Sequence, residues 1–499
     1  MTENRKKIFL YLLLGAYIIV NLVLLYYHEP WRDEAQIWIL SRDLPIWKLP
    51  RQMSYEGHPC LWHVLMYPFA HFGLPYLMQN AAAFVIVTCA AALLIFRSSF
   101  PLYVRAILVF SPFLTYYYPV IARNYCMIPL FLFLLAYWYP SRLERPVRYT
   151  LVIALLVQSH AVMIMTAFSL SLCFLAENCI RFYQDRDGRA FVKRTSPLLL
   201  PLASAVFLLY ELMSVEKSSL LHIKTASVSR TMEKIIDKTV EGLGTLCGFD
   251  GKKGLILLLI GAVFLLLAAF RRKAKAKYTV VTVLTLTYCF QFWFYAMVYN
   301  YSMQRLMTYP LLIIWGMWVL KTESASGKEA ETAASEKQRG IAAVLRPAEL
   351  VFCAFCLLAL FHCVPEIRLD VETPYSNGRE TAAFIKSNIP DEAVILTDNQ
   401  AEVTAIFPYL DRKDYIYAPN GQNFTFVTWD DHWMDKTDYA SFSAWFNGLS
   451  TDGKPVYMIS CVGRSYIEGS EQLAQDYELI YQSLTASVKG EDYAVYRLR

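Results

Sequence analysis

The sequence predicts a polytopic α-helical membrane protein that carries an α/β domain at its C-terminal end. Of the 499 residues, 56% are hydrophobic, which is more than is usual for a soluble globular protein. Apolar runs long enough to cross a bilayer recur from residue 8 to residue 363. Residues 365–499 then return to the composition of a soluble domain. The chain should therefore divide into a membrane module, 1–364, and a separate domain, 365–499.

The apolar runs predict about eleven transmembrane helices, because a helix that crosses a bilayer needs roughly 20 predominantly apolar residues. The first run follows a basic N-terminus and lacks a small-residue cleavage site, so it should be an uncleaved anchor rather than a signal peptide. The predicted spans are residues 8–27, 75–96, 102–119, 125–140, 148–162, 162–180, 196–213, 254–270, 278–298, 306–320 and 346–363.

The basic residues predict the orientation of these spans. Residues 1–364 hold 36 Lys and Arg against 21 Asp and Glu, whereas residues 365–499 hold 11 against 21. With the N-terminus inside, nearly every inner loop is rich in Lys and Arg, as the positive-inside rule requires. The loops 28–74 and 214–253 and the C-terminal domain then lie outside. We expect a multi-pass protein of the cell membrane, and the basic charge, confined to short loops, does not indicate a nucleic-acid partner.

The C-terminal domain alternates helix-like with strand-like stretches, which predicts an α/β sandwich. No glycine fingerprint follows a strand, so nucleotide binding has no support. The segment Thr428–Trp433, TWDDHW, could contact a saccharide, although a surface loop is the simpler interpretation. The predicted helices are 378–388, 400–408, 439–449 and 468–474, and the predicted strands are 393–397, 414–418, 424–429, 455–461, 477–483 and 493–498.

The loop after the first span holds most of the residues suited to chemistry. Residues 28–63 combine Asp33, Glu34, Glu56 and His58 with four tryptophans, a side chain that favours the membrane–water interface. This combination predicts chemistry at the membrane surface.

Helix starts are the structural alternative for these polar residues. Asp33 as N-cap, with Gln36 three residues later, has the spacing of a capping box. A second short helix is expected from Pro59, with His58 at its cap. Two helix N-termini that face each other across one loop would favour an anionic ligand.

Further polar residues fall on the predicted outer side of the membrane. Arg123 and Tyr125 follow the third span, His160 ends the fifth, Lys224 lies in the loop 214–253, and Arg305 precedes a late span. Arginine or lysine at a membrane end can simply reach the interface. Both arginines, however, oppose the positive-inside bias, and a guanidinium group can make two charge-assisted hydrogen bonds to one phosphate.

Four motifs occur in an order that is typical of one family of membrane enzymes. An acidic pair, Asp33–Glu34, is followed by a His-Pro helix start in EGHPCLWHVLMYPFAHFGLP, by A-R-x-Y at Ala122–Tyr125 and by R-x-x-x-x-P at Arg305–Pro310. This order resembles the GT-C glycosyltransferases, especially the protein O-mannosyltransferase and aminoarabinose transferase branch, which is glycosyltransferase family 39-like. The resemblance covers most of residues 8–320, and bacterial members often carry an outer C-terminal domain.

The resemblance implies transfer of one sugar from a polyprenyl (undecaprenyl) phosphate to an acceptor at the outer face of the membrane. Asp33 matches the catalytic or acceptor-orienting aspartate, with Glu34 as its neighbour, and Arg123 and Arg305 match the contacts to the lipid phosphate. We expect Asp33 to act as the base. The acceptor could be a glycan, a lipid or a protein. Five further residues are expected to line the site: Glu56, His58, Tyr125, His160 and Lys224.

Two departures from the family and two alternatives qualify this expectation. The chain has His58-Pro59-Cys60 where many members have two prolines, and it lacks the W-W-D-Y-G segment of oligosaccharyltransferases. A divalent metal could bind the carboxylates, but no second ligand set has a suitable spacing. A multi-pass transporter of a lipid-linked or small polar substrate is the main alternative class; Glu177 and Glu211 could then mark a polar path. A non-catalytic membrane scaffold that presents the C-terminal domain is the other.

Overall fold

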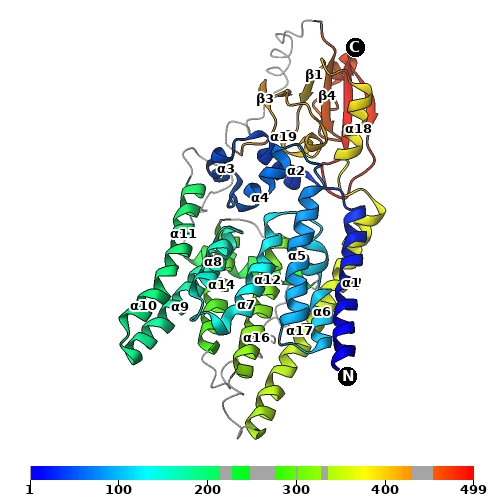
Figure 1. Cartoon of the computed structure of the whole chain (residues 1–499). Coiled ribbons are helices and arrows are strands. Elements are labelled where there is room, and N and C mark those ends of the chain that lie inside the picture. Colours follow the sequence, from blue (N-terminus) through cyan, green and yellow to red (C-terminus); the bar gives the residue numbers. More distant parts are fainter. Residues whose placement is uncertain are drawn as a thin grey trace.

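The computed structural model describes residues 2–213, 228–247, 276–298, 302–326, 335–419, 421–429 and 453–499. A bundle of helices forms the larger part of the molecule, and a sheet domain covers one of its ends (Figure 1). Helix α1 (Glu3–Tyr27) runs from the opposite end of the bundle towards this domain. The predicted combination of a helical membrane part and a C-terminal α/β domain is therefore confirmed.

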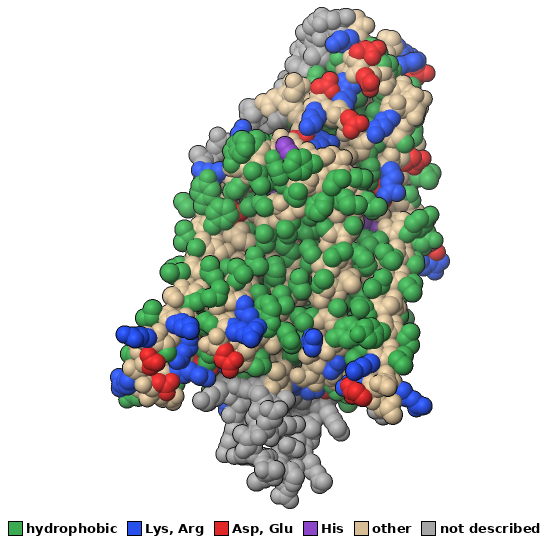
Figure 2. Space-filling model, viewed as in Figure 1, with side chains coloured by type: hydrophobic (Ala, Val, Ile, Leu, Met, Phe, Trp, Pro, Cys, Tyr) green, Lys and Arg blue, Asp and Glu red, His purple; other side chains and the backbone are tan. Residues whose placement is uncertain are grey.

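Six described segments are long and apolar enough to cross a membrane, and each overlaps a predicted span. On the face shown in Figure 2, apolar side chains cover the middle of the bundle, and charged side chains lie at both ends. The chain is a multi-pass membrane protein. The six segments are Glu3–Tyr27, Met78–Arg97, Ala161–Asp185, Gly188–Leu212, Ala276–Met297 and Pro347–Glu372.

The predicted number of eleven spans is not confirmed. Residues 102–119 do not form one helix: α6 (Leu102–Val109) ends and a π-helical turn, η2 (Phe113–Tyr117), follows, because Pro112 lacks the N–H needed to continue α6. The span 254–270 lies outside the described residues. Helix α17 (Ser335–Glu372) runs past residue 364, so the last predicted span is too short.

The other helices of the bundle follow the predicted order. Residues 75–96 become α5 (Met78–Arg97), and residues 125–140 become η3 (Asn124–Cys126), α7 (Met127–Trp138) and η4 (Tyr139–Ser141). The remaining elements are α8 (Pro146–Val157), η5 (Ala161–Met163), α9 (Ile164–Asp185), α10 (Gly188–Thr195), η6 (Ser196–Leu198), α11 (Leu199–Leu212), α12 (Val228–Cys247), α14 (Ala276–Met297), α15 (Met303–Leu306) and α16 (Thr308–Ser326).

The predicted outer loop after α1 folds into short helices beneath the sheet domain (Figure 1). They are α2 (Arg32–Asp43), η1 (Ile46–Lys48), α3 (Leu49–Glu56) and α4 (Leu61–His71). Both predicted helix starts were wrong in position. Helix α2 begins at Arg32 after Trp31, whose N–H donates to Glu34 (3.3 Å), so Asp33 is not the N-cap.

Helix α4 begins at Leu61 rather than Pro59, and Cys60, not His58, is its N-cap. The delay has a local cause. Gly57 ends α3 with a left-handed backbone (φ 73°), a conformation that glycine adopts without strain. The Cys60 N–H then donates to the buried Glu211 carboxylate (3.0 Å), which fixes the turn that carries His58.

The sheet domain has six strands in the order β3-β2-β1-β4-β6-β5. Strand β1 (Val394–Thr397) is parallel to β2 (Tyr415–Tyr417) and β4 (Val456–Cys461), whereas β3 (Gln422–Phe424), β5 (Tyr477–Gln482) and β6 (Tyr493–Leu498) run antiparallel to their neighbours. Five of the six strands lie where predicted. Strand β3 starts earlier than expected because a turn at Gly421 (φ 71°) returns the chain onto β2.

The helices of this domain are α18 (Gly378–Asn388), α19 (Gln400–Val403), η7 (Phe407–Tyr409) and α21 (Glu471–Asp476). The predicted helix 439–449 lies outside the described residues. Helix α2 shares a hydrophobic core with the sheet domain, in which Ala35, Trp38 and Ile39 pack with Val403 and Phe407. Burial of apolar area on both sides favours a fixed arrangement of the two parts.

Candidate active site

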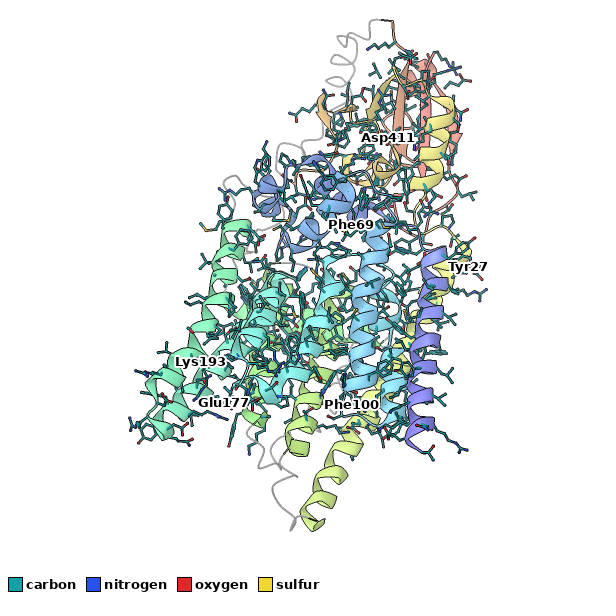
Figure 3. All side chains as sticks on the ribbon, in the orientation of Figure 1. Tyr27, Phe69, Phe100, Glu177, Lys193 and Asp411 are labelled. Carbon is teal, nitrogen blue, oxygen red and sulfur yellow. The ribbon has the colours of Figure 1, made fainter. Side chains whose placement is uncertain are left out.

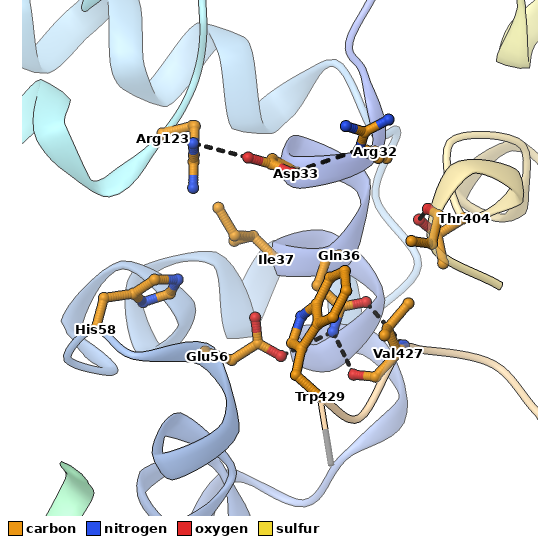
Figure 4. Close-up of a pocket in the computed structure, with 11 residues that line it drawn as sticks. Arg32, Asp33, Gln36, Ile37, Glu56, His58, Arg123, Thr404, Val427 and Trp429 are labelled. Atoms are coloured by element: carbon orange, nitrogen blue, oxygen red, sulfur yellow. Dashed lines mark hydrogen bonds and ion pairs between the residues drawn. The ribbon is translucent and has the colours of Figure 1, made fainter. Parts of the chain in front are cut away.

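A cavity of about 120 Å³ lies where the short helices meet the sheet domain. It is bounded by α2, by the end of α3, by the turn before η3 and by two segments of the sheet domain (Figure 4). Sequence positions nearly 400 residues apart therefore meet here. The lining residues are Arg32, Asp33, Gln36, Ile37, Glu56, His58, Arg123, Ala401, Thr404, Val427 and Trp429.

Asp33 and Arg123 form an ion pair at one end of the cavity. Asp33 lies in the first turn of α2, and one of its oxygens is 2.8 Å from Arg123 Nη1. The Asp33 side chain keeps 30% of its surface exposed and that of Arg123 keeps 12%. Arg123 precedes η3 with an extended backbone, and its Nη1 also lies 3.5 Å from Gln304 Oε1. The structure thus brings together two of the predicted site residues.

Arg305, Tyr125 and His160 form a second layer next to Arg123. The Arg305 Nε donates to the Tyr125 hydroxyl (2.8 Å), and the Arg123 guanidinium lies 5.6 Å from the centre of the Tyr125 ring. The His160 ring stacks on Tyr125 with 4.5 Å between ring centroids. All three residues of this layer are buried. Arg305 adds positive charge near the cavity without lining it.

Glu56 and His58 line the cavity in forms that carry no charge at neutral pH. Burial is the main cause that raises the pKa of Glu56 to about 8; the hydrogen bond from Gln36 opposes this rise, and the negative charge of Asp33 adds a smaller contribution to it. Burial and the charge of Arg123 lower the pKa of His58 to about 4. At pH 7 Glu56 is therefore a hydrogen-bond donor, and His58 is a neutral imidazole.

Glu34 lies outside the cavity, which contradicts its predicted place in the site. Its side chain is fully buried. One oxygen accepts from Asn80 Nδ2 (3.0 Å) and the Ala122 N–H (2.7 Å), and the other accepts from His28 Nε2 (3.2 Å) and the Trp31 N–H. Adjacent helical residues point about 100° apart, so Asp33 faces the cavity while Glu34 faces the protein interior.

His28 joins Glu34 to the last transmembrane helix. Its Nδ1 lies 2.9 Å from an Asp370 oxygen, and its Nε2 faces Glu34. Burial opposes a charge on His28, but the two carboxylates outweigh burial and raise its pKa to about 10. Both ring nitrogens can then donate. The resulting chain of charges fixes the start of α2, and with it Asp33, against α17.

The cavity is also lined by residues that were not predicted from the sequence, among them Arg32, Gln36, Thr404 and Trp429. Arg32 Nη1 lies 3.7 Å from a carboxylate oxygen of Glu402 and 3.9 Å from one of Glu491, both in the sheet domain. Gln36 lies one helical turn after Asp33, a spacing that could have revealed it. Thr404 and Trp429 come from the sheet domain, and only the composition of TWDDHW pointed to the latter.

The remaining candidates lie away from the cavity. Lys224 lies outside the described residues. Glu177 pairs with Arg142 (2.8 Å) at the end of the bundle remote from the sheet domain (Figure 3). Glu211 instead holds the start of α4, so the two acids do not form one polar path. Among the residues that the structure describes, no group of three His, Cys, Asp or Glu side chains could hold a metal ion.

Comparison with known structures identifies the fold. No family model matches the chain, and no curated protein matches its sequence. Two structures of ArnT from Cupriavidus metallidurans, one bound to undecaprenyl phosphate and one in the apo state, match over 98% of this chain and 97% of theirs. Their TM-scores are 0.53 and 0.52, at 11% and 12% sequence identity.

The chain has the GT-C fold. At this level of identity the similarity concerns the fold alone. Since it spans both the helical bundle and the sheet domain, the GT-C fold of this chain includes the surfaces that enclose the cavity. The fold predicted from the four motifs is confirmed.

Proposed function

We propose that the protein transfers a single sugar from a polyprenyl phosphate to an acceptor hydroxyl at the outer face of the cell membrane. The observation that carries this proposal is the Asp33–Arg123 pair, a carboxylate and a guanidinium 2.8 Å apart in a cavity at the end of a membrane-spanning bundle. A similar structure holds undecaprenyl phosphate, which supports that class of carrier. The N-terminus would lie inside the cell and the sheet domain outside.

The reaction requires a base that accepts the proton of the acceptor hydroxyl and, at a different position, a cation that stabilises the leaving phosphate. The acceptor oxygen bonds to the anomeric carbon and its proton passes to Asp33. The bond from that carbon to the phosphate oxygen breaks, and the electron pair stays on the phosphate, which gains a negative charge. Fixed cations stabilise such a leaving group most in a site with little water. Arg123 supplies this charge inside the cavity, and Arg305 supplies it from behind Tyr125.

The Asp33–Arg123 contact also suggests how the base is released. Without donor, Arg123 neutralises Asp33 across 2.8 Å. A phosphate that bound Arg123 would compete for the guanidinium and leave Asp33 free to accept a proton. Base and leaving-group cation would then become available in the same binding event.

Arg123→Ala is expected to weaken donor binding. A hydrogen bond to a charged group contributes about 1.5–3 kcal/mol, so KM for the donor should rise about 10- to 100-fold. Steady-state kinetics with purified protein in detergent measure this value. Arg145→Ala is the matched control, because Arg145 is exposed and does not line the cavity. An unchanged KM in Arg123→Ala would remove Arg123 from the phosphate site.

Glu56 is expected to control the alkaline side of the pH profile. Because its pKa is raised to about 8, Glu56 is protonated at pH 7 and ionises as the pH passes 8, which adds a second negative charge near Asp33. The wild-type kcat/KM should fall with an apparent pKa near 8. In Glu56→Gln, the ratio of kcat/KM at pH 9 to that at pH 7 should stay near one. The same alkaline fall in Glu56→Gln would exclude Glu56 as its cause.

The deciding experiment measures release of polyprenyl phosphate from a panel of polyprenyl phosphate monosaccharides, with crude envelope acceptors present. Release from one donor, dependent on Asp33 and Arg305, would establish the reaction and identify the sugar. If every donor is inert, the proposal fails, and transport of a lipid-linked substrate becomes the function to test.

A further inference from the structure

The cavity has two chemically different ends. At one end lie Arg32, Asp33 and Arg123, which provide charge (Figure 4). At the other lies Trp429, on the same side as Glu56 and Gln36 and separated from the Asp33–Arg123 pair by Ile37 (Figure 4). Trp429 belongs to the sheet domain, so the membrane helices alone do not complete this end.

Gln36 fixes the segment that carries Trp429. Its Oε1 accepts from the Val427 N–H (3.0 Å), and its Nε2 donates to the Val427 carbonyl (2.7 Å). The same Nε2 donates to Glu56 (2.8 Å). Both amide hydrogens are thus in use, and one side chain of α2 holds the ends of α3 and of segment 427–429. Gln36 is a positioning residue rather than a contact for substrate.

A larger interface supports this local contact. Arg42, at the far end of α2, donates from Nη1 to the carbonyls of Phe407 (3.1 Å) and Leu410 (3.2 Å). The apolar side of α2 packs into the core of the sheet domain. Helix α2 therefore carries Asp33 and also holds the segment that carries Trp429, so the packing of α2 against the sheet domain sets the distance between the Asp33 carboxylate and the Trp429 ring.

The order of groups in the cavity suggests what occupies each end. In a polyprenyl phosphate sugar, the anomeric carbon joins the phosphate to the ring. If the phosphate meets Arg123 and the anomeric carbon lies near Asp33, the ring extends towards Trp429. An indole offers a flat apolar face and a polar edge, which matches the C–H face and hydroxyl rim of a pyranose. Protonated Glu56 can donate to a ring hydroxyl.

The size of the cavity agrees with one ring. Sites for drug-sized ligands measure roughly 300–1,000 Å³, whereas this cavity measures about 120 Å³. We propose that Trp429 stacks on the transferred sugar and that the sheet domain thereby selects which sugar is transferred. This inference rests on the proposed function.

The test separates the sugar end of the site from the phosphate end. Kinetics of Trp429→Ala and Trp429→Phe give KM for the sugar donor, and inhibition by undecaprenyl phosphate, which lacks the sugar, gives a Ki. Trp429→Ala should raise the donor KM about tenfold or more, with the Ki within twofold of wild type. Trp429→Phe should recover most of the loss, and Gln36→Leu should resemble Trp429→Ala. Trp47→Ala is the matched control, because Trp47 is 74% exposed and lies outside the cavity.

The outcomes distinguish the two proposals. If the wild type is active but the Trp429 variants keep its donor KM and donor preference, the sheet domain does not select the sugar. The proposed transfer reaction is unaffected by that result. A rise in the acceptor KM alone would overturn it too, because Trp429 would then contact the acceptor. A Ki that rises in parallel with the donor KM would place Trp429 at the phosphate. If the wild type releases no lipid phosphate from any donor, both proposals fail.

Discussion

Asp33→Asn is expected to lower kcat by about 10²- to 10⁴-fold, the usual contribution of a well-placed general base. Asparagine keeps the shape of the side chain but cannot accept the acceptor's proton. The partly exposed Asp33–Arg123 pair should add only about 0–1 kcal/mol to stability, so the folded protein should persist. Release of polyprenyl phosphate under saturating donor measures the effect.

Asp391→Asn is the control for Asp33→Asn, because Asp391 is an exposed acid of the sheet domain outside the cavity. It should retain wild-type activity. The binding of undecaprenyl phosphate provides a second readout: Asp33→Asn should bind this carrier at least as well as wild type, because Arg123 loses its competing partner. If Asp33→Asn turned over within twofold of wild type, Asp33 would not be the base.

Glu34→Ala is expected to destabilise the protein without acting on the chemistry directly. The substitution leaves the buried N–H groups of Asn80 and Ala122 without this acceptor and removes one of the two carboxylates that hold His28. Breaking a buried ion pair by removing one partner costs about 3–5 kcal/mol. The free energy of unfolding in detergent should fall by that amount.

The neighbouring acids serve as controls for each other. Asp33→Asn should lower kcat by about 10²- to 10⁴-fold and leave the unfolding free energy within about 1 kcal/mol of wild type, whereas Glu34→Ala should mainly lower stability. Glu34→Gln keeps an acceptor for Ala122 but loses the ion pair with His28, so its stability should lie between those of wild type and Glu34→Ala. If Glu34→Gln were inactive at wild-type stability, Glu34 would belong to the reaction after all.

Local patterns in the sequence accounted for much of the fold. The long apolar runs and the alternation after residue 365 are signals within single elements, and α18 and β6 match their predicted ranges. Errors arose where neighbours in space decided the outcome. Residues 102–119 divide at Pro112, and α4 starts late because Glu211, from α11, binds the Cys60 N–H. A contact of that kind leaves no mark on the local pattern.

The candidate site shows the same division. The order of the motifs along the chain predicted the fold class and pointed to Asp33 and Arg123, because motif order is a property of the linear sequence. The folded structure was needed to establish that Asp33 faces the cavity and Glu34 the interior, since neighbours on a helix point about 100° apart and packing selects the face. It also brought Trp429 to Gln36 across nearly 400 residues. Such a contact depends on how the sheet domain docks on α2, which is a property of two packed surfaces rather than of either segment.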